Sequence, residues 1–96
     1  MFRVDNYRVS FRRSNTINLR KNNYDTVCNI QNDITDMQYH NVAYLHPSDS
    51  YNKIIGKKVA LTKTLVSMKL NKHLRTKIWN AFWLWVESWN GKRRYK

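Results

Sequence analysis

Apolar and polar residues alternate along the first half of the chain. Between Tyr7 and Arg12, every odd position is apolar or aromatic and every even position is Arg or Ser. A period of two predicts a strand with one buried face and one basic, solvent-facing face. We expect Phe2 and Val4 to extend this strand, and we expect the segments Tyr24–Ile30 and Met37–Leu45 to form two more.

Polar segments separate these strands. Residues Ser14–Asn23 are polar, basic and rich in Asn, which predicts a loop, and Asn32-Asp33 has the side chains that favour a turn. Short connections favour antiparallel pairing of consecutive strands. The first half therefore predicts a three-stranded antiparallel meander over residues of about 2–45.

The second half changes to a helical period. We expect a helix over residues of about 49–68, with Ser48 or Asp49 capping its first N–H groups. Its predicted buried stripe comprises Tyr51, Ile54, Ile55, Val59, Leu61, Leu65, Val66 and Met68. The opposite side carries Lys53, Lys57 and Lys63. An internal Gly costs about 1 kcal/mol relative to Ala, so Gly56 predicts a close approach to a strand, another helix or a phosphate.

A second helix is expected over residues of about 72–90. Asn71 is placed to cap it and Gly91 to end it, which leaves a basic tail over residues 91–96. Its buried face is expected to contain Leu74, Ile78, Ala81, Phe82, Trp85, Val86 and Trp89. Trp79 and Trp83 lie at the edge of that face and Leu84 points away from it. The fold expected is a single α+β domain over residues 1–96, a three-stranded antiparallel meander with two helices packed on one face.

The charge balance points to an anionic partner. Eighteen Lys and Arg residues against six Asp and Glu residues give a formal net charge of +12 at pH 7. Self-repulsion on this scale destabilises a compact chain unless a polyanion or an acidic surface offsets it. Nucleic acid, an acidic protein face and an anionic membrane are the partners considered, and the plain alternative is a protein whose cations are only solvated.

Cysteine usage and hydropathy predict an intracellular protein. Cys28 is the single cysteine, so no disulfide framework forms, and the scattered histidines do not complete a metal site. We expect Cys28 to be a small buried hydrophobe. The N-terminus lacks an apolar signal core, and no run of about eighteen apolar residues occurs. These observations predict a cytoplasmic protein with no membrane span, no metal and no cofactor.

The second half also resembles short bacteriophage accessory proteins over roughly residues 42–83. The likeness is carried by Asp49-x-Tyr51-x-Lys53-x-x-Gly56-Lys57-Lys58-x-Ala60-Leu61-x-Lys63-x-Leu65 and by Leu74-Arg75-x-x-Ile78-Trp79-x-x-Phe82. This chain departs from the pattern at Lys57, where Arg is more usual, and in its richer Trp content after Phe82. The resemblance implies a phage protein that acts on host machinery, including defence systems, in the host bacterial cytoplasm.

A second likeness is to the double-stranded RNA-binding domain, in which three strands also precede a helix that opens with Lys-Lys-x-Ala. The corresponding element here is Lys57-Lys58-Val59-Ala60. This chain lacks the first helix of that family, and Lys63 and Thr64 stand where small residues are expected.

The residue pattern favours binding over catalysis. No paired carboxylates, phosphate-cradling Gly loop or metal-ligand spacing occurs in the sequence. The segment His46-Pro47-Ser48-Asp49 contains the residue types of a hydrolytic triad, but helix capping accounts for Ser48 and Asp49. We therefore expect no catalytic residue and no enzymatic activity.

The leading interpretation is a basic protein that binds nucleic acid or a host nucleoprotein complex. The cations expected to contact this partner are Arg8, Arg12, Arg13, Arg20, Lys21, Lys53, Lys57, Lys58, Lys63, Lys92, Arg93 and Arg94. Trp83 and Leu84 are expected to supply an apolar contact, since Trp is enriched among interface hot spots. The competing interpretation is a protein–protein inhibitor or homodimer that uses the Trp-rich C-terminal helix and whose charge only steers association. A helix lying in a membrane interface is the third interpretation.

Overall fold

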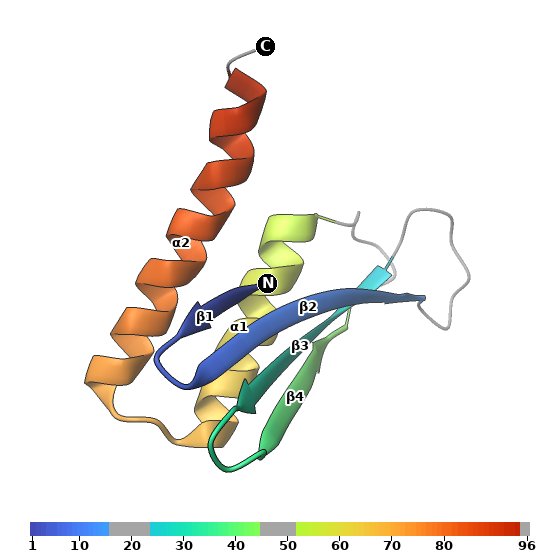
Figure 1. Ribbon diagram of the computed structural model, residues 1–96. Coiled ribbons are helices and arrows are strands. Elements are labelled where there is room, and N and C mark those ends of the chain that lie inside the picture. Colours follow the sequence, from blue (N-terminus) through green and yellow to red (C-terminus); the bar gives the residue numbers. More distant parts are fainter. Residues whose placement is uncertain (16–23, 45–51, 95–96) are drawn as a thin grey trace.

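The computed structural model describes residues 1–15, 24–44 and 52–94, with the side chains of residues 1–14, 25–44 and 52–88. Its elements are β1 (Phe2–Val4), β2 (Tyr7–Asn15), β3 (Tyr24–Asn32), β4 (Gln38–Ala43), α1 (Lys53–Met68) and α2 (Lys72–Arg94). The strands form one antiparallel sheet in sequential order, and both helices cover the same face of it (Figure 1). The α+β class and the meander followed by two helices are confirmed, but the predicted number of strands was too low.

The fourth strand arises because the N-terminal segment folds back on β2. Val4 pairs with Tyr7 across a two-residue turn at Asp5-Asn6. Asp5 has a φ of 50°, a left-handed conformation that short polar side chains tolerate better than most. The prediction that Phe2 and Val4 extend the following strand was therefore wrong.

The alternation predicted for β2 and β3 is confirmed by their register. Val9 pairs with Ile30 and Phe11 pairs with Cys28, so these four side chains share the helix-covered face. Val9, Cys28 and Ile30 are completely buried there. Burial raises the pKa of the Cys28 thiol to about 12, although a hydrogen bond with Thr64 opposes part of the shift. Cys28 is therefore the buried, protonated side chain that the sequence predicts.

Helix α1 begins later than predicted, and its buried face agrees only in part with the predicted stripe. Asn52 caps it, because its Oδ1 accepts hydrogen bonds from the N–H groups of Ile54 and Ile55 at 3.0 Å each. The predicted caps at Ser48 and Asp49, together with Tyr51, lie outside the described residues. The buried residues are Ala60, Leu61, Thr64 and Leu65.

Three members of the predicted buried stripe of α1 lie in solvent instead. Ile55, Val59 and Val66 are 59%, 42% and 68% exposed. Small residues face the sheet because they allow the helix to approach it closely. Leu61 and Leu65 are buried as predicted, and Ile54 and Met68 pack against the core, so the predicted face is correct in part.

Helix α2 is capped as predicted and runs further than predicted. The Asn71 Oδ1 accepts a hydrogen bond from the Leu74 N–H at 2.8 Å. The helix passes the expected stop at Gly91 and ends at Arg94, so most of the predicted basic tail is helical. Residues 95–96 lie outside the described part of the chain.

Aromatic side chains join α2 to the sheet. Phe82 is completely buried, and the Phe11 ring stacks on Trp85 with centroids 5.6 Å apart and planes 15° apart. Phe2 contacts both Phe82 and Trp85. Aromatic residues bury large areas per side chain, so a few of them suffice to hold α2 on a small sheet.

Candidate nucleic-acid interface

A close contact between α1 and β3 fixes the position of the first turn of α1 over the sheet. Gly56 lies directly over Thr26, and a Cβ built at position 56 would overlap the Thr26 Oγ1. The predicted close approach of Gly56 is thus to a strand. Because Gly56 is in the first turn of α1, this contact places the positive end of the helix dipole at the end of the sheet where β2 stops.

Three cations converge at that end of the sheet. Arg13 pairs with Thr26 in the β2–β3 register, and Lys53 and Lys57 project from the first turns of α1. The Lys57 ammonium lies 6.0 Å from the centroid of the Phe11 ring. Partial burial lowers the pKa of Lys57, and the positive charges of Lys53 and Arg13 lower it further. The first turn of α1 itself contains no acidic residue, and Asp25 is buried nearby where β3 pairs with the end of β2.

An exposed indole continues this cationic region onto α2. The Lys58 ammonium lies 5.9 Å from the centroid of the Trp83 ring, within cation–π range. Trp83 is 43% exposed, and its ring is nearly parallel to that of Trp79, with centroids 6.5 Å apart and planes 26° apart. An edge-on contact with Phe82 at 5.1 Å also supports the Trp83 ring. The Trp83 side chain is therefore held in place with part of its surface open to solvent.

We call this set of side chains the basic–aromatic surface. Its members are Arg13, Lys53, Lys57, Lys58 and Trp83. It combines cations that attract phosphate with an aromatic ring on which a base can stack. All five residues were predicted as partner contacts from the sequence, and the structure brings them together.

The other predicted contact residues lie elsewhere. Arg8 is engaged by Asp33, with its guanidinium 2.8 Å from a carboxylate oxygen, on the face of the sheet that the helices leave open. Arg12 is on that same face. The Lys63 ammonium donates to the Val42 carbonyl at 3.1 Å, on the β4 side of α1.

The remaining predicted contact residues are not assigned to the basic–aromatic surface. Leu84 is 67% exposed on α2, as expected for a residue that points away from the core. Five cations have no described side chain: Arg20, Lys21, Lys92, Arg93 and Arg94.

Three of the described acidic residues, Asp5, Asp33 and Asp36, lie at the opposite end of the sheet, whereas Asp25 is buried at the end where β2 stops. Asp5 lies in the β1–β2 turn, and Asp33 and Asp36 lie in the β3–β4 turn. These two turns touch, since the Asp33 N–H donates to the Asn6 carbonyl at 2.8 Å. Asp5 also contacts the Lys77 ammonium at 3.0 Å. At the turn end, Asp33 therefore neutralises Arg3 and Arg8, and Asp5 neutralises Lys77.

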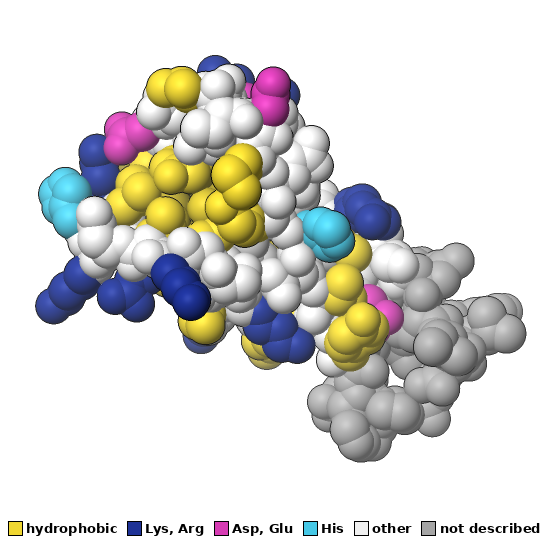
Figure 2. Space-filling view, turned by 90° about the horizontal axis from the view of Figure 1, so that it is seen from below, with side chains coloured by type: hydrophobic (Ala, Val, Ile, Leu, Met, Phe, Trp, Pro, Cys, Tyr) yellow, Lys and Arg dark blue, Asp and Glu magenta, His cyan; other side chains and the backbone are white. Residues whose placement is uncertain are grey.

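Figure 2 looks at this turn end, where the β3–β4 turn and the α1–α2 connection meet. Hydrophobic side chains gather in the middle of this face, with cationic and acidic groups around them. Partly buried residues that close the core, including Met68, Leu70 and Leu74, belong to the elements that meet there. We interpret this patch as the edge of the core.

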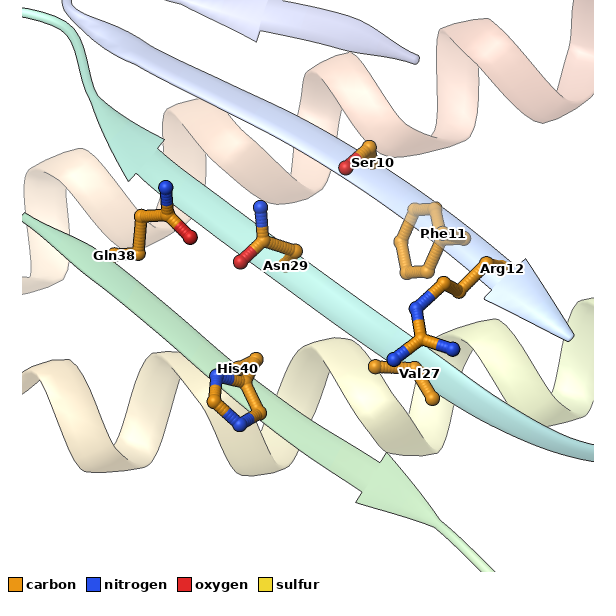
Figure 3. A pocket seen from close by; sticks show the side chains of 7 residues that line it. All are labelled: Ser10, Phe11, Arg12, Val27, Asn29, Gln38 and His40. Atoms are coloured by element: carbon orange, nitrogen blue, oxygen red, sulfur yellow. The ribbon is translucent and has the colours of Figure 1, made fainter. Parts of the chain in front are cut away.

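The open face of the sheet carries a shallow hollow of about 330 Å³. Figure 3 shows Ser10, Asn29 and His40 in one row across β2, β3 and β4, with Val27 and Arg12 in the neighbouring part of the sheet. Because β3 separates Ser10 from His40, their backbones are about 9–10 Å apart, too far for the imidazole to activate the hydroxyl. The hollow is lined by hydrogen-bonding groups and also by Phe11, whose ring stacks on Trp85.

Comparison with family models, with curated proteins and with solved structures finds no match for this chain. Among the described residues, no group of three or more His, Cys, Asp or Glu side chains is placed to hold a metal ion. No helix in the described part of the chain is both long and apolar enough to cross a membrane.

Proposed function

We propose that this protein binds nucleic acid through the basic–aromatic surface. The observation that carries the proposal is the convergence of Arg13, Lys53 and Lys57 beside a supported, partly exposed Trp83. Clustered cations attract phosphate groups, and their contacts with phosphate release the counterions condensed on nucleic acid. The exposed indole favours single strands, whose unpaired bases are free to stack.

The wider biological setting rests on the resemblance to phage accessory proteins. In that setting the partner is nucleic acid or a host nucleoprotein complex in the host bacterial cytoplasm, and the effect is inhibition of host machinery or defence. The competing proposal is an inhibitor or homodimer that binds through the C-terminal helix. Among the described apolar side chains of α2, Trp79 and Trp85 contact the aromatic core, which leaves Trp83 and Leu84 for such a partner.

A salt titration with matched charge variants tests the proposal. The Lys53→Gln/Lys57→Gln variant is compared with Lys72→Gln/Arg75→Gln. The second variant also removes two positive charges, but from the exposed start of α2. For a single-stranded oligonucleotide, each lost phosphate contact lowers the slope of log K against log salt by roughly 0.7. We expect the first variant to lose roughly 1.4 in slope and about tenfold or more in affinity at low salt. Equal losses in both variants would show that net charge alone drives binding and would refute the assignment.

Substitution at Trp83 tests the stacking contact. Loss of one base–aromatic stack costs about 1–3 kcal/mol, so Trp83→Ala should weaken single-strand binding strongly while Trp83→Phe retains most of it. Leu84→Ala is the control, because this neighbour is more exposed but carries no ring. If the protein bound duplex tightly and Trp83→Ala had no effect on that binding, the proposed phosphate contacts would stand but base stacking on Trp83 would be excluded.

A further inference from the structure

The outward side of α1 carries an apolar stripe. Ile55, Val59 and Val66 are all exposed, and Thr62 is exposed between them. Their spacing of four, three and four residues places all four on one narrow side of the helix. The stripe extends over about 16 Å of helix. The Thr62 hydroxyl donates to the Lys58 carbonyl of its own helix at 2.9 Å, so its hydrogen-bonding need is met within α1.

Cations border this stripe on both sides. Lys58 flanks it on the side of α2, where its ammonium lies over Trp83. Lys63 flanks it on the side of β4, where its ammonium lies 5.7 Å from the centroid of the Tyr44 ring. Both positions follow from the helical geometry and agree with the contacts these side chains make. The side is thus apolar in the middle and positive along both edges.

None of the described elements covers this side. Helix α1 packs on β3 and β4 through its opposite side, and its buried residues Leu61 and Leu65 join the core that it shares with α2. Single exposed apolar residues are ordinary on protein surfaces, but a row of them along three turns marks an interaction site.

The geometry points to a partner helix that is apolar along one face and acidic along both flanks of that face. Side chains such as Leu would bury Ile55, Val59 and Val66, and Glu or Asp would meet Lys58 and Lys63. This is the helix-to-helix arrangement in which apolar residues form the seam and charges beside it select the partner. A second copy of this chain does not fit, because it would bring its own cations against these two lysines.

The proposed stripe is separate from the basic–aromatic surface and shares only Lys58 with it. Variants of Ile55 and Val66, which are not part of the basic–aromatic surface, therefore test the stripe separately from nucleic-acid binding. A protein that binds nucleic acid through one and an acidic helix through the other could contact both components of a nucleoprotein assembly.

A synthetic amphipathic peptide with Leu on one face and Glu on both flanks tests this inference. Titration of the isotope-labelled protein, followed by nuclear magnetic resonance, should shift the methyl signals of Ile55, Val59 and Val66. A peptide of the same composition in scrambled order, and one with Lys in place of Glu, should leave these signals unchanged. Equal binding of the scrambled peptide, or shifts confined to other surfaces, would overturn the proposal.

Matched variants complete the test. Ile55→Gln/Val66→Gln should bind the peptide about tenfold or more weakly, because two side chains no longer leave water on binding. Leu84→Gln, which changes an equally exposed apolar residue of α2, should bind normally. Both variants should keep wild-type affinity for oligonucleotide. Self-association through the stripe, or uptake by anionic vesicles while the peptide is ignored, would also overturn the proposal.

Discussion

Replacing Gly56 with Ala should destabilise the protein, although Ala is the better helix former. In an open helix interior this change gains about 1 kcal/mol. Here the new methyl group would overlap the Thr26 Oγ1 and lie 3.3 Å from the Thr26 Cβ. Overpacking at such a contact costs about 1–3 kcal/mol. We therefore expect a net loss of up to about 2 kcal/mol in the free energy of unfolding.

The same substitution should behave differently when Thr26 is shortened. Thr26→Ala removes the Oγ1 that Gly56→Ala would strike, so in this background the second change should be neutral or stabilising by up to about 1 kcal/mol. A double-mutant cycle should therefore give a favourable coupling of about 1–3 kcal/mol between the two positions. Thr26→Val replaces the hydroxyl with a methyl group of similar size, so it tests the polarity of the Thr26 side chain apart from its volume. The buried Thr26 Oγ1 has no hydrogen-bond partner among the described residues, so its removal at constant volume should not destabilise the fold.

Urea unfolding followed by far-ultraviolet circular dichroism measures each free energy in the cycle. The reasoning would be refuted if Gly56→Ala stabilised the protein equally in both backgrounds, within about 0.5 kcal/mol. That outcome would mean that α1 does not rest on β3 at this point. The placement of Lys53 and Lys57 beside Arg13 would then lose its structural basis.

Three further outcomes are expected from single residues. Lys57→Met should raise the urea midpoint slightly at neutral pH while weakening oligonucleotide binding, because burial and two neighbouring cations lower the pKa of Lys57 in the folded protein. A fall in the urea midpoint would contradict this. Wild-type protein should lose stability as pH rises from 9.0 toward about 12, since the folded state keeps the Cys28 proton that the unfolded state releases, and Cys28→Ala should lose less. The Cys28 thiol should also react with Ellman's reagent only as fast as the protein unfolds. Asn52→Ala should cost about 1 kcal/mol by removing the α1 cap, whereas Asn52→Asp should retain most of the stability.

Much of the architecture was readable from the sequence. The alternation in β2 and β3 and the cap at Asn71 were predicted correctly because they depend on local periodicity and local hydrogen bonding. The turn at Asp5-Asn6 was missed, yet it left a signal. Apolar residues occupy even positions at Phe2 and Val4 and odd positions from Tyr7 onward, and this change of parity marks the end of one strand.

The hydrophobic pattern of α1 identified only part of its inward face, namely Ile54, Leu61, Leu65 and Met68. Ile55, Val59 and Val66 are more apolar than Ala60 and Thr64, yet the small residues face the sheet. The distance between α1 and β3 decides which face is buried, and that distance depends on Gly56 and Thr26, two residues far apart in sequence. The same dependence on long-range contacts explains why the sequence could predict which cations contact a partner but not which of them lie together in the fold. Arg13 and Lys57 become neighbours only when the helix folds over the sheet.

The uneven arrangement of charge along the sheet also affects how the molecule meets a partner. Asp5, Asp33 and Asp36 lie in the two turns, whereas Arg13, Lys53 and Lys57 lie with Asp25 toward the first turn of α1, and this uneven distribution gives the protein an electric moment. A polyanion exerts a torque on such a body before any contact is made, so the molecule arrives already rotated with one end forward. Fewer encounters are then wasted in the wrong orientation, and this advantage disappears once dissolved ions shorten the range of the field.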